Sequence, residues 1–406
     1  MTLQGGISVS QTHYTVAIVG GGSGGIAVAA RLARAAKGLY GKIAILDPAE
    51  KHYYQPLWTL VGGGVARKEA TERKMSALIP EGVDWLQDSV TDILPEENLL
   101  VTAKGMSVRY DYLVVAAGIH VAWEKIKGLR ETLGKNGVCS NYSYDLVDST
   151  WENIRDFSGG NAIFTQPNTP VKCGGAPQKI MYLAEEFFCK KAIRQHCQVI
   201  FASASPTIFA VKKYAATLDQ VILRKQIITK FKRNLIEIKP DAKEAVFEHV
   251  ETGELEVLPY SMIHVVPPMH APPFIQKSPI ADQAGWVDVD KYTLQHKRFA
   301  DVFALGDCSN LPTSKTGAAI RKQAPVVAGN LLARMEGKPL PEKYDGYTSC
   351  PLVTGYGNLV LAEFDYDLNP RETFWFDQSK ERYSMYLLKK HVLPVMYWQG
   401  MMKGRM

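Results

Sequence analysis

The feature that most constrains the fold is a glycine-rich segment that follows an apolar run near the N-terminus. Residues 14–19 are apolar or β-branched without alternation, which predicts a parallel strand buried on both faces. The next glycines and an alanine-rich stretch predict a helix over residues 26–36. Gly20, Gly22 and Gly25 satisfy the pattern G-x-G-x-x-G, in which a tight turn presents bare backbone N–H groups to a pyrophosphate at the helix start.

An acid in the expected place supports this interpretation. A second strand is predicted over residues 42–46 and ends at Asp47, about 20 residues beyond the glycines, where a carboxylate accepts hydrogen bonds from ribose hydroxyls. The order of strand, glycine turn, helix, strand and acid predicts a dinucleotide-binding domain. For Asp47 by itself, an ordinary solvated acid at a strand end is the alternative.

Two later segments bear on which dinucleotide is bound. Residues 110–118 predict a strand that ends in small residues at Gly118, and residues 299–307 predict a strand that ends in Gly-Asp at Asp307. With the glycine motif, these segments resemble the flavoprotein disulfide reductase superfamily, which has two dinucleotide-binding domains. The resemblance implies FAD as cofactor, with Asp307 on its ribityl and phosphate groups. From the residues alone, an ordinary helix N-cap is the alternative for Asp307.

The second nucleotide fingerprint of that superfamily is missing here. Residues 160–175 begin with a strand, but no G-x-G-x-x-G follows, and Pro167 and Pro170 remove backbone donors that phosphates would need. The strand at residues 198–202 ends at Ser203 instead of an acid. We therefore expect a second Rossmann-like domain without a nicotinamide site, so that electrons enter by another route.

A cysteine lies where the nicotinamide loop would be. Cys173 precedes a helix predicted over residues 179–191, with Pro177 in the first-turn position that favours proline. The positive end of the helix dipole, with Lys172 beside it, favours a nucleophilic thiolate, although a small buried loop cysteine is the alternative. None of the six cysteines forms a C-x-x-C pair, so no metal or haem site is predicted. Residues 1–13 lack the apolar stretch of a secretory signal, so structural disulfides are not expected.

A second cysteine motif extends the resemblance. The segments Lys-Cys-Gly-Gly-Ala-Pro-Gln-Lys (residues 172–179) and Thr-Ser-Cys-Pro-Leu-Val-Thr-Gly-Tyr (residues 348–356) resemble the sulfide:quinone oxidoreductases, in the branch that includes the mitochondrial enzyme. Residues 52–62, 312–316 and 376–382 resemble the same family. The resemblance implies an FAD-dependent enzyme that oxidises hydrogen sulfide and reduces a membrane quinone.

The resemblance also implies roles for individual residues. Sulfide attacks a disulfide or sulfur-bridged Cys173–Cys350 pair, Cys350 carries the resulting persulfide, and the Cys173 thiolate sends two electrons into the flavin. The persulfide sulfur passes to a small acceptor such as sulfite, glutathione, cyanide or another sulfide. Lys315 is a candidate for the flavin pyrimidine edge or the quinone headgroup, with a solvated lysine as the alternative. Cys308 is expected to be structural, as are His264 and His270.

The last residues of the chain mix apolar, aromatic and basic side chains. Residues 383–402 carry tyrosines, a tryptophan and lysines on a short apolar segment, and Pro394 is expected to kink or divide any helix there. This pattern predicts an anchor in a membrane interface, and a helix packed on its own domain or in a dimer contact is the alternative. No apolar run reaches the length of a membrane span, and nucleic acid is not an expected partner.

These inferences give one overall expectation: an α/β protein with two Rossmann-like domains and a C-terminal segment at the membrane interface. The expected parts are residues 1–122 and 286–345 (FAD-binding domain), residues 123–285 (second Rossmann-like domain) and residues 346–406 (redox cysteine and membrane segment). A peripheral protein on the cytoplasmic face of a bacterial inner membrane is expected, with the matrix side of the mitochondrial inner membrane as the alternative. A homodimer is compatible with the sequence.

Three other functions compete with this expectation. A type-II NADH:quinone dehydrogenase has the same fold but needs the missing second glycine fingerprint. A flavocytochrome c sulfide dehydrogenase is exported and works with a haem partner. A flavin-bearing sensor, whose cysteines switch its conformation, would bind flavin without turning over quinone.

Overall fold

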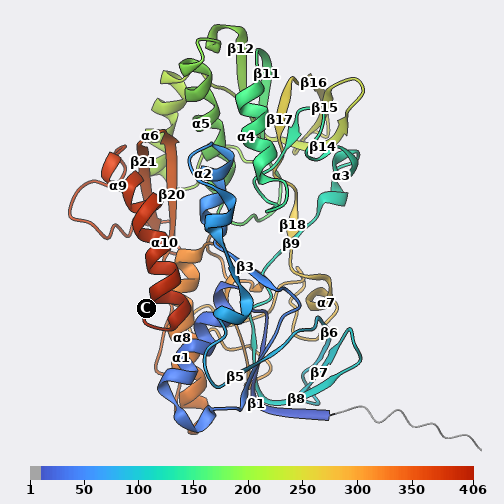
Figure 1. The fold of residues 1–406 in the computed structure, drawn as a ribbon, viewed down its shortest axis with the longest axis vertical. Helices are drawn as coiled ribbons and strands as arrows, with labels where there is room; N and C mark the ends of the chain where they lie inside the picture. Colours follow the sequence, from blue (N-terminus) through green and yellow to red (C-terminus); the bar gives the residue numbers. More distant parts are fainter. Residues whose placement is uncertain (1–10) are drawn as a thin grey trace, which may run out of the picture.

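The computed structural model describes residues 11–406 as two lobes joined in the middle of the molecule (Figure 1). Residues 1–10 lie outside the described residues, and most of the segment 1–13, which was predicted to lack a secretory signal, falls there. The lower lobe in Figure 1 contains β1 and the first helix, and the upper lobe contains β11, β12 and the helices α4 to α6. The two-lobed α/β architecture predicted from the sequence is confirmed.

The lower lobe is built on a seven-stranded sheet in which β1 (Gln11–Val19) lies between β2 (Ile43–Leu46) and β8 (Ser107–Val115), all parallel. The amino-terminal half of β8 pairs antiparallel with β7, and its carboxyl-terminal half pairs in parallel with β19 (Val302–Ala304). The remaining strands are β5 (Val83–Leu86), β6 (Val90–Leu94) and β7 (Leu99–Thr102). Helices α1 (Ser23–Ala35) and α8 (Gly317–Met335) pack against each other.

The upper lobe contains a parallel sheet in the order β10–β17–β11–β12–β13. Its strands are β10 (Val138–Cys139), β17 (Met262–His264), β11 (Gly160–Gln166), β12 (Cys197–Ser203) and β13 (Ile228–Phe231). Three helices accompany it: α4 (Val147–Asp156), α5 (Ala176–Lys190) and α6 (Lys212–Arg224). A small antiparallel sheet of β14 (Arg233–Lys239), β15 (Glu244–His249) and β16 (Leu255–Pro259) completes the lobe. This is the predicted second Rossmann-like unit.

Two short strands cross between the lobes. The strand β9 (His120–Val121) leads from the lower lobe to the upper one, and β18 (Met269–His270) leads back; they pair antiparallel with His120 opposite His270. Directly after β18, Ala271 and the residues of α7 (Pro273–Gln276) join the core of the lower lobe. The expected domain boundaries stay predictions.

The C-terminal region adds a hairpin and a helical segment. In the hairpin, β20 (Thr348–Gly355) pairs with β21 (Asn358–Phe364), and β20 packs on α5 and α8. The helical segment runs from α9 (Tyr383–Leu387) through π-helical turns and α10 (Leu393–Val395) to Lys403, and its end packs on α1. Pro394 lies in the first turn of α10, directly after the π-helical turn Leu388–Val392, and the segment changes its turn type there without ending. Among the helices of residues 11–406, none combines the length and hydropathy that crossing a bilayer requires.

Candidate redox and cofactor site

The predicted cofactor residues meet at one edge of the lower sheet. Asp47 follows β2, Gly20 follows β1, Gly118 comes shortly after β8, and Asp307 comes shortly after β19. These four strands are parallel neighbours, so their carboxyl ends lie at the same edge. In open α/β sheets, that edge is where a nucleotide binds.

The glycine turn has the shape that a phosphate requires. A Cβ on Gly25 would lie 1.8 Å from the carbonyl oxygen of Gly20, and a Cβ on Gly20, whose φ is +104°, would lie 2.4 Å from the carbonyl oxygen of Ala116. These two glycines are therefore required by the packing of the turn. Gly22 has no atom within 4 Å of its Cβ position and caps the start of α1, whose first turn holds no acid. This leaves open space at a helix N-terminus, where an anion is favoured.

The two acids are held in ways that suit a cofactor rather than solvent. Asp47 accepts hydrogen bonds from the backbone N–H groups of Gly21 (2.6 Å) and Ala49 (2.8 Å), and burial raises its pKa. Asp307 is enclosed, burial raises its pKa, and its Oδ1 has no hydrogen-bond partner among residues 11–406. A buried acceptor without a partner calls for a donor from outside the chain. The site therefore fits a bound dinucleotide.

Lys315 connects the cofactor edge to the redox loop. Its Nζ donates to the carbonyl oxygens of Asp307 (2.7 Å) and Ser309 (2.9 Å), and burial lowers its pKa. The solvated-lysine alternative is therefore wrong. The carbonyl oxygen of Lys315 accepts a hydrogen bond from the backbone N–H of Cys173 (2.7 Å). The role of its ammonium group toward flavin or quinone stays a prediction.

The two cysteines named from the sequence lie together. Cys173 is in the loop before α5 with a left-handed φ of +54°, and Cys350 is buried on β20; their Sγ atoms are 3.7 Å apart, and both are free thiols in this structure. Ser314, which precedes Lys315, lies beside both cysteines: its Oγ is 3.7 Å from the Cys350 Sγ and accepts a hydrogen bond from the Gly174 N–H at 3.2 Å. Residues distant in sequence thus form one site beside Asp307 and Lys315.

The electrostatic environments of the two thiols are opposite. The hydrogen bond shared with Cys350 holds the pKa of Cys173 well below its usual range, and the Lys179 ammonium, 3.3 Å from the Cys173 Sγ, acts in the same direction against the effect of burial. The same hydrogen bond and burial raise the pKa of Cys350 well above its usual range. The site therefore favours negative charge on Cys173 and a neutral thiol at Cys350.

The lysine that contacts the thiolate differs from the one expected. Lys172 turns its Nζ to the Gln55 Oε1 (2.8 Å), so the prediction that it assists Cys173 is wrong. Lys179 takes that place: α5 begins at Ala176, three residues earlier than predicted, and from its first turn Lys179 directs its Nζ to the Cys173 Sγ. A lysine in the first turn of the predicted helix was the signal available for Lys179.

A second lysine was missed by sequence reasoning. Lys389, from the C-terminal helical segment, is buried and donates to the Pro56 carbonyl oxygen (3.0 Å). Burial, with repulsion from Lys179, lowers its pKa to about 7, while negative charge on Cys173 and Cys350 opposes this. No local pattern singles out Lys389 among the basic residues of the tail, because its position depends on how the tail folds back over the site.

The C-terminal segment also contacts the glycine turn. The Tyr397 hydroxyl lies 2.6 Å from the Ser23 Oγ and 2.5 Å from the His52 Nε2, and the His52 Nδ1 lies 3.1 Å from the Gly21 carbonyl oxygen. One face of the segment is thus packed on the chain's own domain, which agrees with the alternative prediction of a helix packed there. The other face exposes apolar side chains: Tyr383, Leu387, Val392 and Val395.

The third cysteine near the cofactor edge has a different environment. The Cys308 Sγ is buried, lies 3.5 Å from the carbonyl oxygens of Val115 and Leu305, and burial raises its pKa to about 11. These contacts suit the structural role expected for it. His264 is buried too; its Nε2 accepts from the Asn141 N–H (3.0 Å), and burial lowers its pKa to about 3.

Comparisons with known proteins agree with this geometry. Residues 14–153 match the family model described as pyridine nucleotide-disulphide oxidoreductase. The chain is 49% identical over 401 residues to the mitochondrial sulfide:quinone oxidoreductase of Mus musculus, with 98% of this chain and 89% of the relative covered. It is 52% identical to the mitochondrial sulfide:quinone oxidoreductase of Dictyostelium discoideum, with 96% and 86% covered. The structure of the sulfide:quinone oxidoreductase of Aquifex aeolicus shares the fold, with a TM-score of 0.83, 18% identity, and 97% and 92% of the two chains covered.

Proposed function

The chain belongs to the sulfide:quinone oxidoreductase family, and from this premise we propose that Cys173 and Cys350 are its redox pair. The protein is an FAD-dependent oxidoreductase that couples sulfide oxidation to quinone reduction. The observation that carries the proposal is the 3.7 Å approach of two thiols with opposite pKa shifts, next to a lysine and the cofactor edge.

The pKa difference assigns a role to each sulfur. When HS⁻ attacks the oxidised pair, the sulfur that leaves most readily is the one with the lower pKa. That sulfur is Cys173, whose negative charge is stabilised by Lys179 at 3.3 Å. HS⁻ therefore forms its new S–S bond with Cys350, the Cys173–Cys350 bond breaks, and Cys350 holds the persulfide.

The cycle closes when the sulfur leaves and the pair is oxidised again. A nucleophilic acceptor such as sulfite, glutathione, cyanide or a second sulfide takes the outer sulfur and leaves Cys350 as a thiolate. Loss of two electrons from the two thiolates restores their bond. Gly20, Gly22, Gly25, Asp47, Gly118 and Asp307 would hold FAD, which would supply the two-electron chemistry that links the cysteine pair to quinone. The Nζ of Lys389, with a pKa of about 7, can hold or release a proton beside the pair near neutral pH.

The direct test of this function is sulfide-dependent reduction of a short-chain ubiquinone by the purified protein. We expect turnover that requires sulfide and increases when sulfite is added as sulfur acceptor. Quinone reduction at the same rate with NADH in place of sulfide would overturn the proposal and favour a type-II dehydrogenase.

Lys179 is expected to set the reactivity of Cys173. In Lys179→Met, loss of the ammonium at 3.3 Å raises the pKa of Cys173, so iodoacetamide should alkylate the reduced protein at least about tenfold more slowly at pH 7 than wild type. The two rates should converge as the pH rises above about 8.5, the ordinary thiol pKa. Lys172→Met is the matched control, because its Nζ contacts Gln55. Overlapping pH profiles of Lys179→Met and wild type would contradict this role.

We propose further that the exposed face of the C-terminal segment rests on a membrane. Figure 1 places this segment and the loop before α9 along one side of the molecule. Leu387 and Val395 are exposed on the segment, and Trp375 in the loop is 96% exposed. Aromatic and aliphatic side chains with basic neighbours favour the lipid interface, and a quinone substrate resides in lipid. The named relatives are mitochondrial, which favours the mitochondrial alternative over the bacterial location.

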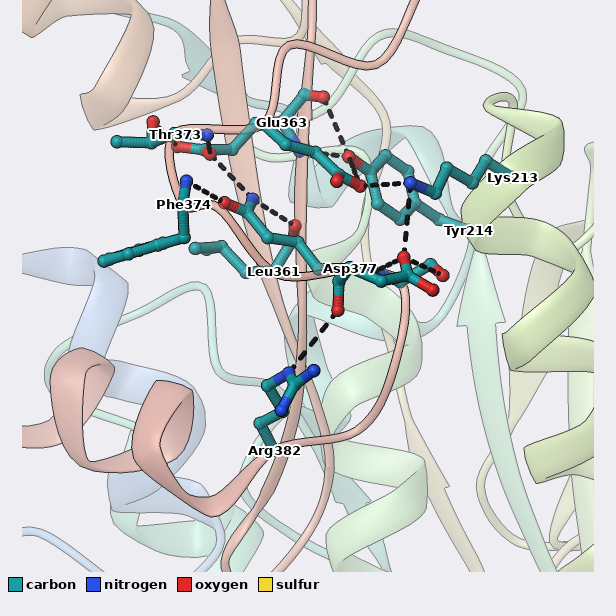
Figure 2. A network of polar contacts seen from close by, with 11 residues as sticks. Lys213, Tyr214, Leu361, Glu363, Thr373, Phe374, Asp377 and Arg382 are labelled. Carbon is teal, nitrogen blue, oxygen red and sulfur yellow. Dashed lines mark hydrogen bonds and ion pairs between the residues drawn. The ribbon is translucent and has the colours of Figure 1, made fainter.

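The loop that carries Trp375 is held firmly, which suits an anchor (Figure 2). The buried Glu363 of β21 accepts hydrogen bonds from the Thr373 N–H (2.7 Å) and the Gln378 Nε2 (2.7 Å). Lys213 of α6 pairs with Asp377 at 3.2 Å. Trp375 is thus exposed between anchored neighbours, so the backbone of this loop loses little further conformational entropy on binding.

The membrane proposal predicts a selective loss of lipid binding. Leu387→Glu combined with Val395→Glu should lower co-sedimentation with phosphatidylcholine–cardiolipin vesicles at least about tenfold, because two charges would have to enter the apolar interface. Leu255→Glu, at an exposed leucine of β16 (60% exposed), is the matched control. Anaerobic bleaching of the flavin by sulfide should be unchanged in all variants. Equal vesicle binding by the double variant and wild type would overturn the assignment of this face.

A further inference from the structure

Outside the redox site, three potential metal ligands lie together on the strands that join the lobes. His120 of β9, Glu124 of the following turn and His270 of β18 each offer a ligand atom, and these atoms all lie within 4.8 Å of one another. The His120 and His270 rings are stacked with centroids 4.8 Å apart, because the two residues are directly opposite in the β9–β18 pairing. The His120 Nε2 is 3.8 Å from the Glu124 Oε1.

From this cluster we propose a binding site for a divalent transition metal, with Zn²⁺ as the fitting ion. Two histidines and one glutamate form a ligand set that Zn²⁺ accepts, with a fourth position open to water. With Zn–N and Zn–O bonds of about 2.0–2.2 Å, tetrahedral ligand atoms lie roughly 3.3 Å apart. The observed spacing therefore closes around an ion by small side-chain rotations. These side chains are partly exposed, so an ion reaches them from solvent.

A neighbouring carbonyl already orients one of the ligands. The His270 Nδ1 lies 2.8 Å from the Ala271 carbonyl oxygen and 2.7 Å from the Gln276 Nε2, so these contacts hold this nitrogen and leave Nε2 as the ring nitrogen that can bind an ion. The Gln276 Nε2 donates to the same carbonyl oxygen at 2.6 Å and fixes its position. Metal-binding histidines are typically held in this way, with the second ring nitrogen donating to a backbone carbonyl.

The site lies on the two connections between the lobes, so a bound ion would stabilise these connections. The strands β9 and β18 cross between the lobes, so one ion bound by both would join the outgoing and returning connections. The paired strands β9 and β18 form a two-stranded ribbon. On its opposite face, the Sδ of the buried Met269 accepts a hydrogen bond from the Lys172 N–H (3.4 Å), and Met269 packs against Val171. The ribbon therefore supports the loop that carries Cys173. Bound metal stabilises the connection behind that loop without contacting the sulfur.

The test is calorimetric titration of Zn²⁺ into the FAD-loaded protein without reductant. Wild type should bind one Zn²⁺ at this site, and His120→Gln and His270→Gln should each weaken that binding at least about tenfold, because each removes one of three ligands. Thermal unfolding should move to higher temperature with Zn²⁺ in wild type and not in these variants. His13→Gln is the matched control, since His13 forms an exposed pair with Asp111 (2.9 Å) away from the cluster.

The thiols remain in every variant, so any Zn²⁺ that they bind is the same in all of them. A difference in Zn²⁺ affinity between variants therefore reports on the His120, Glu124 and His270 site. Retained bleaching of the flavin by sulfide shows that a variant is folded, and Glu124→Gln provides a third test if a histidine variant fails to fold. Zn²⁺ affinity and stoichiometry unchanged in both histidine variants would overturn the proposal. So would an equal loss of affinity in His13→Gln. Neither result bears on the redox pair, because no residue of the cluster contacts it.

Discussion

Cys350→Ser is expected to lower sulfide-dependent quinone reduction by at least about a thousandfold, the scale found when a covalent nucleophile is removed. Serine cannot accept the sulfur of HS⁻, and it cannot form the bond with Cys173 whose re-formation from two thiolates releases two electrons. Cys173→Ser should be equally inactive for a different reason, because the leaving thiolate 3.7 Å away is then missing. Steady-state reduction of a short-chain ubiquinone with sulfide measures both.

The two variants should also differ in how they react with an alkylating agent. Cys350→Ser retains Cys173 and Lys179, so the reduced protein should still be alkylated at neutral pH, whereas Cys173→Ser should lose this fast reaction. Cys189→Ser is the matched control, since that thiol is exposed and contacts Glu185 at 3.2 Å. Turnover within tenfold of wild type in either redox variant would remove that cysteine from the mechanism.

Gly25→Ala should abolish flavin binding. The added methyl carbon would lie 1.8 Å from the Gly20 carbonyl oxygen, so the glycine turn must move, and with it the backbone N–H groups at the start of α1. We expect the purified variant to lack the visible flavin absorbance and to have at least about a hundredfold weaker FAD affinity, which fluorescence titration of the apoprotein measures.

A matched glycine separates this effect from general damage. Gly38→Ala adds the same methyl group at an exposed position with no atom within 4 Å, so flavin content should equal that of wild type. Stoichiometric FAD in Gly25→Ala would show that the glycine turn is not the dinucleotide site.

Several parts of this site could be predicted from the sequence because each has a local signal. The glycines and Asp47 follow strands that are apolar on both faces, and Cys173 comes directly before the start of α5. The pairing of Cys173 with Cys350 came from the resemblance of two motifs to a family. In the structure, the pairing depends on β20 packing against α5, a long-range contact without a local signal.

The residues that sequence reasoning missed depend on tertiary structure. Lys172 was assigned to the thiolate because it precedes Cys173 in the sequence, whereas Lys179 reaches the Cys173 Sγ from the first turn of α5. Lys389 and Tyr397 were counted with an interfacial anchor, because apolar and basic residues give the same composition whether a helix faces lipid or its own domain. In the structure, Lys389 and Tyr397 are buried against the chain's own domain, while Leu387 and Val395 are exposed.

The measurement that tests the central claim most directly is the anaerobic spectrum of the flavin. Sulfide added to the oxidised protein should bleach the flavin absorbance near 450 nm, about one equivalent should suffice in the presence of sulfite, and a short-chain ubiquinone should restore the colour. NADH should leave the spectrum unchanged. Bleaching by NADH but not by sulfide would contradict the account, because the electrons would then enter without the Cys173–Cys350 pair.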